Sequence, residues 1–162
     1  MRLILIRLIT VVEYLLVAYI LFISITSLLP IDRFFNYTKE ISNAIQDGTY
    51  YQADDDQQIY FDRVIKSKGL IYHSSTNDAS IIVSSHNLLH HSIPNRPSLK
   101  VVTKDGETEV ITNGGGATSN LFRTTGHYDF SNLPDGIESL TLYSNRYGES
   151  FSFTYKIGDQ HE

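Results

Sequence analysis

Histidines with the spacing of metal ligands are the residues best suited to carry chemistry in this sequence. His86 and His90 are four residues apart, so a helix would place both on one face, and His91 follows directly. Zinc or nickel would need further ligands, but no cysteine or carboxylate occurs between Ala79 and Lys104. Two prolines in this stretch also favour a loop. We therefore expect a solvated loop through His86–Pro97 and no bound metal.

No other pattern typical of catalysis or cofactor binding occurs in the sequence. The G-x-S-x-G motif that holds a serine nucleophile is absent, and Gly114-Gly115-Gly116 lacks the lysine and helix of a phosphate-binding loop. The adjacent carboxylates Asp54-Asp55-Asp56 lack the spacing and the glycine of a calcium loop, and they indicate a solvated turn. We expect a protein that is not an enzyme and that binds no cofactor.

Composition and charge narrow the class of protein. The 162 residues contain no cysteine, so neither a disulfide nor a thiolate zinc site can form, which is compatible with a bacterial envelope protein. When Arg2, Arg7 and Glu13 are set aside, the chain carries 11 basic and 17 acidic side chains, a formal charge of about −6. Such a surface repels nucleic-acid phosphates, so we expect no nucleic-acid partner.

A long apolar segment predicts a transmembrane anchor within residues 1–30. Leu8–Leu29 provides 22 residues with Glu13 as the only charge, and a bilayer-spanning helix needs about 20. The segment is longer than the apolar part of a cleaved signal peptide, and it has no small-residue cleavage site. Because Arg2 and Arg7 precede it, we expect a single-pass cell-membrane protein with a cytoplasmic N-terminus and its C-terminal domain outside.

Glu13 has two interpretations. Its side chain can reach the lipid headgroups near the end of the span, or it contacts another membrane protein, since ionisable groups inside a membrane often mark partner contacts. Ile9–Leu16 resembles the start of type IV pilins and pseudopilins, whose mature helix has a glutamate as its fifth residue. Those precursors have a small residue before the cleavage point, where this chain has Leu8. The resemblance implies a pilin-like or membrane-complex structural subunit as the alternative function.

Residues 31–57 are expected to form a short amphipathic helix and a linker. Apolar residues within Ile31–Ile45 recur at intervals of three and four, which is typical of a helix with one apolar face. Asp47-Gly48 is a typical helix end. Because this helix contains Phe34-Phe35 near its start, it suits either the membrane surface or a position beneath the following domain.

The remainder, residues 58–162, predicts an antiparallel β-sandwich. Phe151–Ile157 alternates apolar and polar residues, so one face of this last strand is buried. Turns are expected at Lys68-Gly69 and, as a tight hairpin, at Lys104–Glu107, and an open loop is expected at Asn113–Asn120. The expected strands are Gln58–Ile65, Leu70–Ser75, Ala79–Ser85, Leu99–Thr103, Thr108–Thr112, Tyr128–Phe130, Ser139–Ser144 and Ser150–Ile157. Their number and length are typical of an immunoglobulin-like sandwich.

Five segments of this domain carry a family resemblance. They are Ile59–Ile65, Gly69–Tyr72, Leu99–Gly106, Asn113–Gly116 and Tyr128–Leu142. Through them the domain resembles the immunoglobulin-like C-terminal domains of Bacillus-type membrane-anchored anti-sigma-factor-like proteins and related envelope proteins, over roughly Gln58–Ile157. The resemblance implies an extracytoplasmic module and no catalytic residues. Almost nothing of this chain is expected in the cytoplasm, so sigma-factor control by this chain alone does not follow.

These features together predict a membrane-tethered module that binds or senses a ligand outside the cytoplasm. Its expected partners are membrane lipid and another membrane or envelope protein. The strand faces of a sandwich form its core, so we expect loops to carry recognition. The candidate recognition residues are His86, His90, His91, Arg96, Asn113, Gly114, Gly115 and Gly116, with Glu13 as a candidate contact within the membrane.

Overall fold

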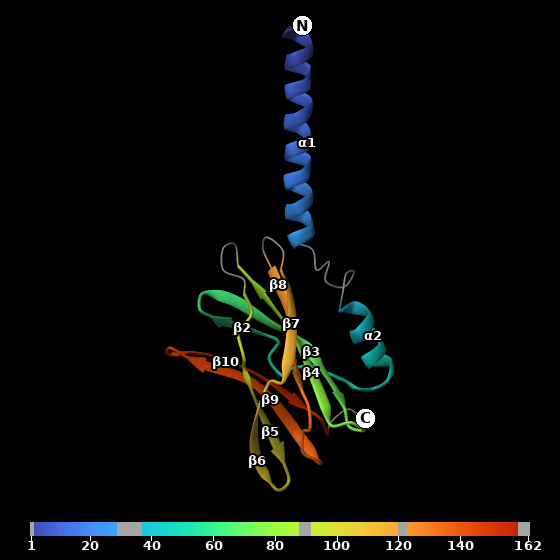
Figure 1. Ribbon diagram of the computed structural model, residues 1–162, viewed down its shortest axis with the longest axis vertical. Helices are drawn as coiled ribbons and strands as arrows, with labels where there is room; N and C mark the ends of the chain where they lie inside the picture. Colours follow the sequence, from blue (N-terminus) through green and yellow to red (C-terminus); the bar gives the residue numbers. More distant parts are fainter. Residues whose placement is uncertain (1, 29–36, 88–91, 120–122, 159–162) are drawn as a thin grey trace. The chain divides into compact units, whose positions relative to one another are not determined.

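The chain folds as two separate units, one helical and one mainly β. The computed structural model describes residues 2–28, 37–87, 92–119 and 123–158 (Figure 1). The first unit is Met1–Thr38 and the second is Lys39–Glu162. The second unit therefore begins ahead of the first expected strand at Gln58.

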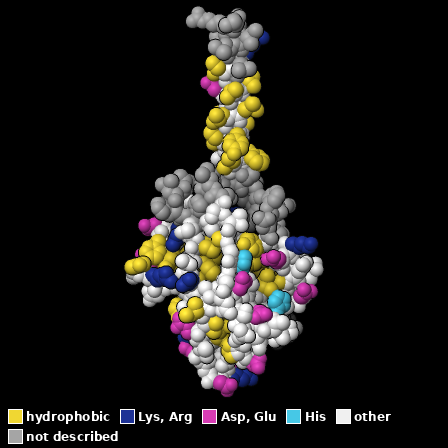
Figure 2. Space-filling model, in the orientation of Figure 1, with side chains coloured by type: hydrophobic (Ala, Val, Ile, Leu, Met, Phe, Trp, Pro, Cys, Tyr) yellow, Lys and Arg dark blue, Asp and Glu magenta, His cyan; other side chains and the backbone are white. Residues whose placement is uncertain are grey.

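The first unit contains one long helix, α1, which runs from Arg2 to Leu28. Hydrophobic side chains cover the visible face of its described part (Figure 2), and large ones such as Leu15 and Phe22 are both 65% exposed. Glu13 is exposed on the same helix. Among the described residues, no helix has the length and hydropathy required of a membrane span.

The second helix, α2, covers Thr38–Gln46 and ends where the sequence predicts. The Thr49 N–H donates to the Ala44 carbonyl oxygen at 2.8 Å, and Gly48 adopts a φ of 67°, which is typical of a helix C-terminus. Ala44 is buried whereas Ile45 is exposed, so the helix buries a single narrow face. The expected start of this helix, including Phe34-Phe35, lies outside the described residues.

In the described residues, ten strands form two antiparallel sheets. They are β1 (Tyr50–Tyr51), β2 (Gln57–Tyr60), β3 (Arg63–His73), β4 (Asp78–His86), β5 (Ser98–Thr103), β6 (Gly106–Ile111), β7 (Gly114–Ser119), β8 (Arg123–Phe130), β9 (Ile137–Arg146) and β10 (Glu149–Lys156). The larger sheet has the order β1-β3-β4-β8-β7, and β2 also pairs with β3. The smaller sheet has the order β10-β9-β5-β6. The prediction of a mainly β, antiparallel fold is therefore confirmed.

The two sheets face each other across one hydrophobic core. Strand β10 buries Phe151, Phe153 and Tyr155 and exposes Ser152 and Lys156. This confirms the predicted alternation. The same core contains apolar side chains from both sheets, among them Ile81, Phe130, Leu140 and Leu142. Burial of these alternating faces is what holds the sheets together.

Two predictions for the first strands are wrong: one continuous strand and one turn. Gln58–Ile65 is interrupted, because Phe61 and Asp62 both have positive φ angles (48° and 56°) and form a two-residue turn between β2 and β3. Lys68-Gly69 is not a turn; it lies inside β3, where the pairing with β4 shifts register. Gly69 has a φ of 126°, and a Cβ on it would lie 2.6 Å from the ring carbon Cζ of Tyr50, so this irregular position requires glycine.

The prediction of an open loop at Asn113–Asn120 is also wrong over most of its length. Gly114–Ser119 is strand β7, and it pairs with β8 with Gly116 opposite His127. Glycines carry no side chain, so the sequence shows no alternation there, and pairing with β8 forms the strand instead. The hairpin predicted at Lys104–Glu107 is confirmed, since Thr103 pairs with Gly106.

Candidate functional site

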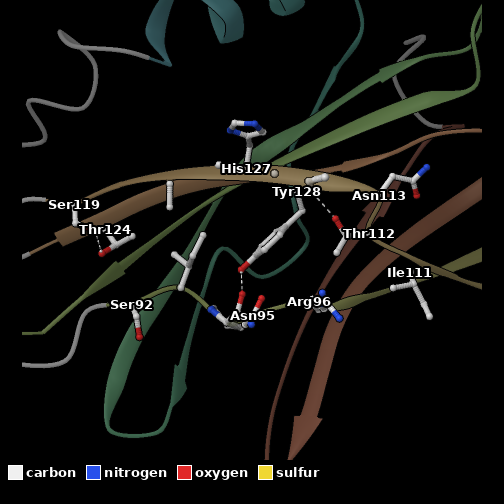
Figure 3. A pocket seen from close by; sticks show the side chains of 16 residues that line it. Ser92, Asn95, Arg96, Ile111, Thr112, Asn113, Ser119, Thr124, His127 and Tyr128 are labelled. Carbon is white, nitrogen blue, oxygen red and sulfur yellow. Dashed lines mark hydrogen bonds between the residues drawn. The ribbon is translucent and has the colours of Figure 1, made fainter.

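An open groove of about 670 Å³ lies beside β7 and β8 (Figure 3). Three segments line it: Ser92–Arg96 ahead of β5, Ile111–Ala117 from the end of β6 into β7, and part of β8. It thus brings together the two segments from which recognition was expected. Arg96 lines the groove, and so do Asn113, Gly114, Gly115 and Gly116.

The hairpin of β5 and β6 brings the first two segments together. Ser98 at the start of β5 pairs with Ile111 at the end of β6. The residues before Ser98 and those after Ile111 therefore leave the hairpin side by side. This proximity follows from the Asp-Gly turn that the sequence already indicated, so it could have been found from the sequence alone.

Tyr128 and Gly126 of β8 hold the segment Ser92–Arg96 in place. The Tyr128 hydroxyl donates a hydrogen bond to the Pro94 carbonyl oxygen, and Figure 3 shows the ring pointing from β8 toward Asn95. Burial raises the pKa of Tyr128 far above its usual value, so the hydroxyl keeps its proton and remains a donor. Gly126 lies against the Ile93 side chain, and any Cβ at this position would clash with the terminal carbon of Ile93.

The chain enters β7 through a local irregularity. The Asn113 N–H donates to the Asp129 carbonyl oxygen at 2.9 Å, while Gly114 is itself the register partner of Asp129. Asn113, just ahead of β7, and Gly114, its first residue, thus both face Asp129 of β8, which is the arrangement of a β-bulge. The Thr112 hydroxyl lies 2.6 Å from the Gly114 carbonyl oxygen and 3.2 Å from that of Asp129, which stabilises this corner.

The groove differs from the rest of the surface in charge. No Asp or Glu occurs among the described residues that line it, and Arg96 is the one residue there with a permanent positive charge. Arg96 is exposed and has a positive φ of 51°. Because the chain as a whole has a formal charge of −5, the groove is a local exception in an acidic protein.

His127 is not one of the candidate recognition residues from the sequence, yet it lies at the rim of the groove. Its Nε2 atom is 3.4 Å from Oδ2 of Asp129, whose Oδ1 accepts a hydrogen bond of 2.9 Å from the Ser80 hydroxyl. Figure 3 shows His127 on the side of β8 opposite to Tyr128. The alternation of Thr124, Gly126 and Tyr128 into the core could have revealed β8 over its full length, and with it this position.

His86, the one candidate recognition histidine that the structure describes, does not line the groove. His86 ends β4, and its ring accepts a hydrogen bond from Nε of Arg123, which is 3.2 Å from Nε2. Burial and two neighbouring lysines hold the pKa of His86 below its usual value, so the ring is neutral at pH 7. His90 and His91 lie outside the described residues. In the described ranges, no three His, Asp or Glu side chains gather closely enough to hold a metal ion.

The fold and this groove define a class: a two-sheet antiparallel β domain with an open, weakly basic groove at one sheet edge. Comparison with known protein families, with characterised proteins and with solved structures gives no match to this chain. The groove offers hydrogen-bonding backbone, an arginine and two exposed or half-buried isoleucines, Ile93 and Ile111. Such a lining is suited to binding a ligand.

Proposed function

We propose that this chain is a membrane-tethered binding or sensing module of the bacterial envelope, and that the groove beside β7 is its recognition surface. The observation that carries the proposal is the meeting of Arg96 with Asn113–Gly116 in one groove. Segments far apart in the sequence, and predicted separately to recognise a partner, thus share one concave surface. Concave sites with a few polar groups among apolar ones are the usual form of binding sites.

The proposed anchor is the apolar segment Leu8–Leu29. This segment extends past the described residues, so the anchor rests on its sequence, together with the exposure of large apolar side chains along α1. Side chains such as Leu15 and Phe22 need an apolar environment, which lipid provides. With Arg2 and Arg7 on the cytoplasmic side, the β domain lies outside the cytoplasm.

An immunoglobulin-like sandwich and an envelope location belong to the same proposal. Two antiparallel sheets over one core support the sandwich. The resemblance to the C-terminal domains of anti-sigma-factor-like proteins supports an extracytoplasmic module whose partner is another membrane or envelope protein.

Site-specific photocrosslinking in intact cells tests the proposed function. A photoreactive residue replaces Ile111 in the groove, and a matched control replaces Ile59 on β2; the two side chains are 65% and 69% exposed. We expect a discrete crosslinked partner from position 111 that is missing from position 59, and a much weaker crosslink when Arg96→Glu is added. Equal capture from both positions would show that the groove is not a recognition surface.

The alternative, a pilin-like or membrane-complex subunit, depends on Glu13, which is exposed on α1. In that case the mature chain would begin at Ile9, with Glu13 as its fifth residue. The mass of the N-terminal peptide from membranes distinguishes the two functions. An intact Met1 supports the tethered module, and a chain that starts at Ile9 supports the subunit.

A further inference from the structure

Within the part of the chain that the structure describes, strand β7 is a sheet edge that lacks the usual protection. An edge strand exposes unpaired backbone N–H and C=O groups, and proteins commonly block them with short strands, charges, or covering groups. The larger sheet ends at β7 on one side and at β1 and β2 on the other, and the smaller sheet ends at β10 and β6. Comparison of these edges identifies the one open to a partner.

Side chains and loops cover the edge of β10. The side-chain amide of Gln58 accepts a 2.8 Å hydrogen bond from the Ser152 N–H and donates to the Ser152 carbonyl oxygen. The Asp54 N–H donates to the Thr154 carbonyl oxygen at 2.9 Å. The salt bridge between Asp54 and Lys156, 3.2 Å long, lies beside these bonds. Another strand cannot pair with β10 until these contacts break.

The two other edges are protected by charge and by length. On β6, Glu107 forms a 2.6 Å salt bridge with Lys100 of β5, and Glu109 is exposed. The strands β1 and β2 contain two and four residues, which is too short to align a long partner strand. Covering contacts at β10, charges at β6 and the short length of β1 and β2 therefore oppose the pairing of a further strand at these three edges.

The sequence of β7 contains none of these devices. Its six residues are three glycines, an alanine, a threonine and a serine, without a charge or a proline. The carbonyl oxygen of Gly116 faces β8, 2.6 Å from the place where Gly126 would carry a Cβ. Because backbone groups alternate in direction along a strand, those of Gly115 and Ala117 point away from β8. Among the described residues nothing pairs with these outward groups, so β7 offers donors and acceptors for a further strand, directly beside the groove.

We infer that β7 binds an extended peptide segment of a partner protein by strand addition, with alternate side chains of that segment in the groove. The inference rests on the proposed recognition role of the groove and names its ligand class. Main-chain hydrogen bonds to Gly115 and Ala117 supply affinity, while the groove supplies specificity. The segment carries an apolar side chain over Ile111 and an acidic one at Arg96, since the described groove lining contains no carboxylate.

The size of the groove favours a partner peptide over a second copy of this chain. Two β7 strands paired about a twofold axis would bring only glycine, alanine, threonine and serine side chains to the groove. A groove of about 670 Å³ would then stay largely empty. That volume lies within the range of roughly 300–1,000 Å³ that is typical of ligand sites filled by larger groups.

A peptide selection tests this inference. The full chain in detergent micelles is the target, and a displayed library of random ten-residue peptides is the probe. Enriched peptides are synthesised, and their Kd values are measured. Ala117→Pro removes one outward N–H and leaves the neighbouring bonds to β8 in place, so binding should weaken at least tenfold. Ala117→Ser is the matched variant that keeps the N–H, and it should change Kd by less than threefold. Circular dichroism checks that both variants are folded.

Two further measurements make the outcome specific. On addition of a selected peptide, hydrogen exchange at the amides of Gly115 and Ala117 should slow, whereas exchange along β10 should not. Replacing the acidic residue of the peptide by lysine should weaken binding to the original chain and restore it with Arg96→Glu. Peptides that bind both proline and serine variants equally, or a library that yields no binder, would overturn strand addition.

The crosslinking of Ile111 in cells separates this result from the proposed function. Suppose that a partner is captured at Ile111 while the Kd values of the selected peptides do not change with Ala117→Pro. This result would identify the groove as a recognition surface for a folded or non-peptide ligand, and it would overturn strand addition. A chain that is dimeric in micelles, becomes monomeric with Ala117→Pro and selects no peptide would identify a second copy as the occupant and overturn the peptide inference.

Discussion

The hydroxyl groups of Ser67 on β3 and Tyr155 on β10 lie 2.8 Å apart and connect the two sheets by a buried hydrogen bond. Ser67 is located where β3 loses its regular register with β4, and its Oγ also accepts a hydrogen bond from the Gly69 N–H at 3.3 Å. Burial raises the pKa of Tyr155, so its hydroxyl stays protonated. A buried polar pair of this kind fixes how the irregular part of β3 faces the opposite sheet.

Tyr155→Phe should lower the free energy of unfolding by about 1–3 kcal/mol, because the Ser67 hydroxyl loses a buried partner. The measurement is urea unfolding of the fragment Lys39–Glu162, which is the compact β unit. In a double-mutant cycle, Ser67→Ala should lower the free energy of unfolding less in the Tyr155→Phe background than in the unaltered chain. Strictly additive costs would show that the two hydroxyls do not interact.

Phe153→Ala should destabilise the same fragment by roughly 3–5 kcal/mol, which is the usual cost of emptying an aromatic core position. Phe153 is fully buried, whereas the neighbouring Ser152 points to solvent. Ser152→Ala is therefore the control, and it leaves the backbone contacts of Ser152 with Gln58 intact. A larger effect from Ser152→Ala than from Phe153→Ala would mean that the faces of β10 are reversed.

His86 should make the domain less stable in mild acid. Its folded pKa lies below the unfolded value of about 6.5, so its neutral form is favoured by folding, and stability falls as the pH drops through 6.5 toward the folded pKa. A charged His86 would also lose the hydrogen bond from Arg123. We expect His86→Gln to reduce the drop in melting temperature between pH 8 and pH 5.

The control for His86 is His73→Gln, at an exposed position at the end of β3. It should leave the pH dependence of the melting temperature close to that of the unaltered chain. An unchanged pH dependence in His86→Gln would contradict the assignment of a neutral, hydrogen-bonded ring.

Strands with one buried face could be predicted from the sequence, because burial imposes alternation. This holds for β10, whose Phe151, Phe153 and Tyr155 all point inward. The turn at Phe61-Asp62 was missed because neither residue is a glycine or an asparagine, the usual residues at positive φ. The tertiary contacts of the domain stabilise that turn, and no short sequence pattern shows them.

The candidate site was predicted in parts. Arg96 and Asn113–Gly116 were chosen as separate loop residues, but the groove needs two long-range relationships as well. One is the pairing of Ser98 with Ile111, which the hairpin turn implies; the other is the contact of Tyr128 with Pro94, which depends on side-chain packing. The second could not be read from the sequence, since the two residues are 34 positions apart.

Gly126→Ala should disrupt the groove at its base. A Cβ at this position would clash with the Ile93 side chain and would lie 2.6 Å from the Gly116 carbonyl oxygen, so both the segment Ser92–Arg96 and strand β7 would have to move. Overpacking of this kind typically costs about 1–3 kcal/mol. The displaced segment should also weaken the crosslink from Ile111, because Arg96 would no longer face β7.

The matched control for this change is Gly158→Ala, where an added Cβ meets nothing within 4 Å. The unfolding midpoint of each variant gives the cost of the clash, and the yield of the Ile111 crosslink gives its effect on recognition. We expect Gly126→Ala to lower both values and Gly158→Ala to lower neither. If Gly126→Ala were as stable as Gly158→Ala, Ile93 could not pack against β8, and the groove would have a different base.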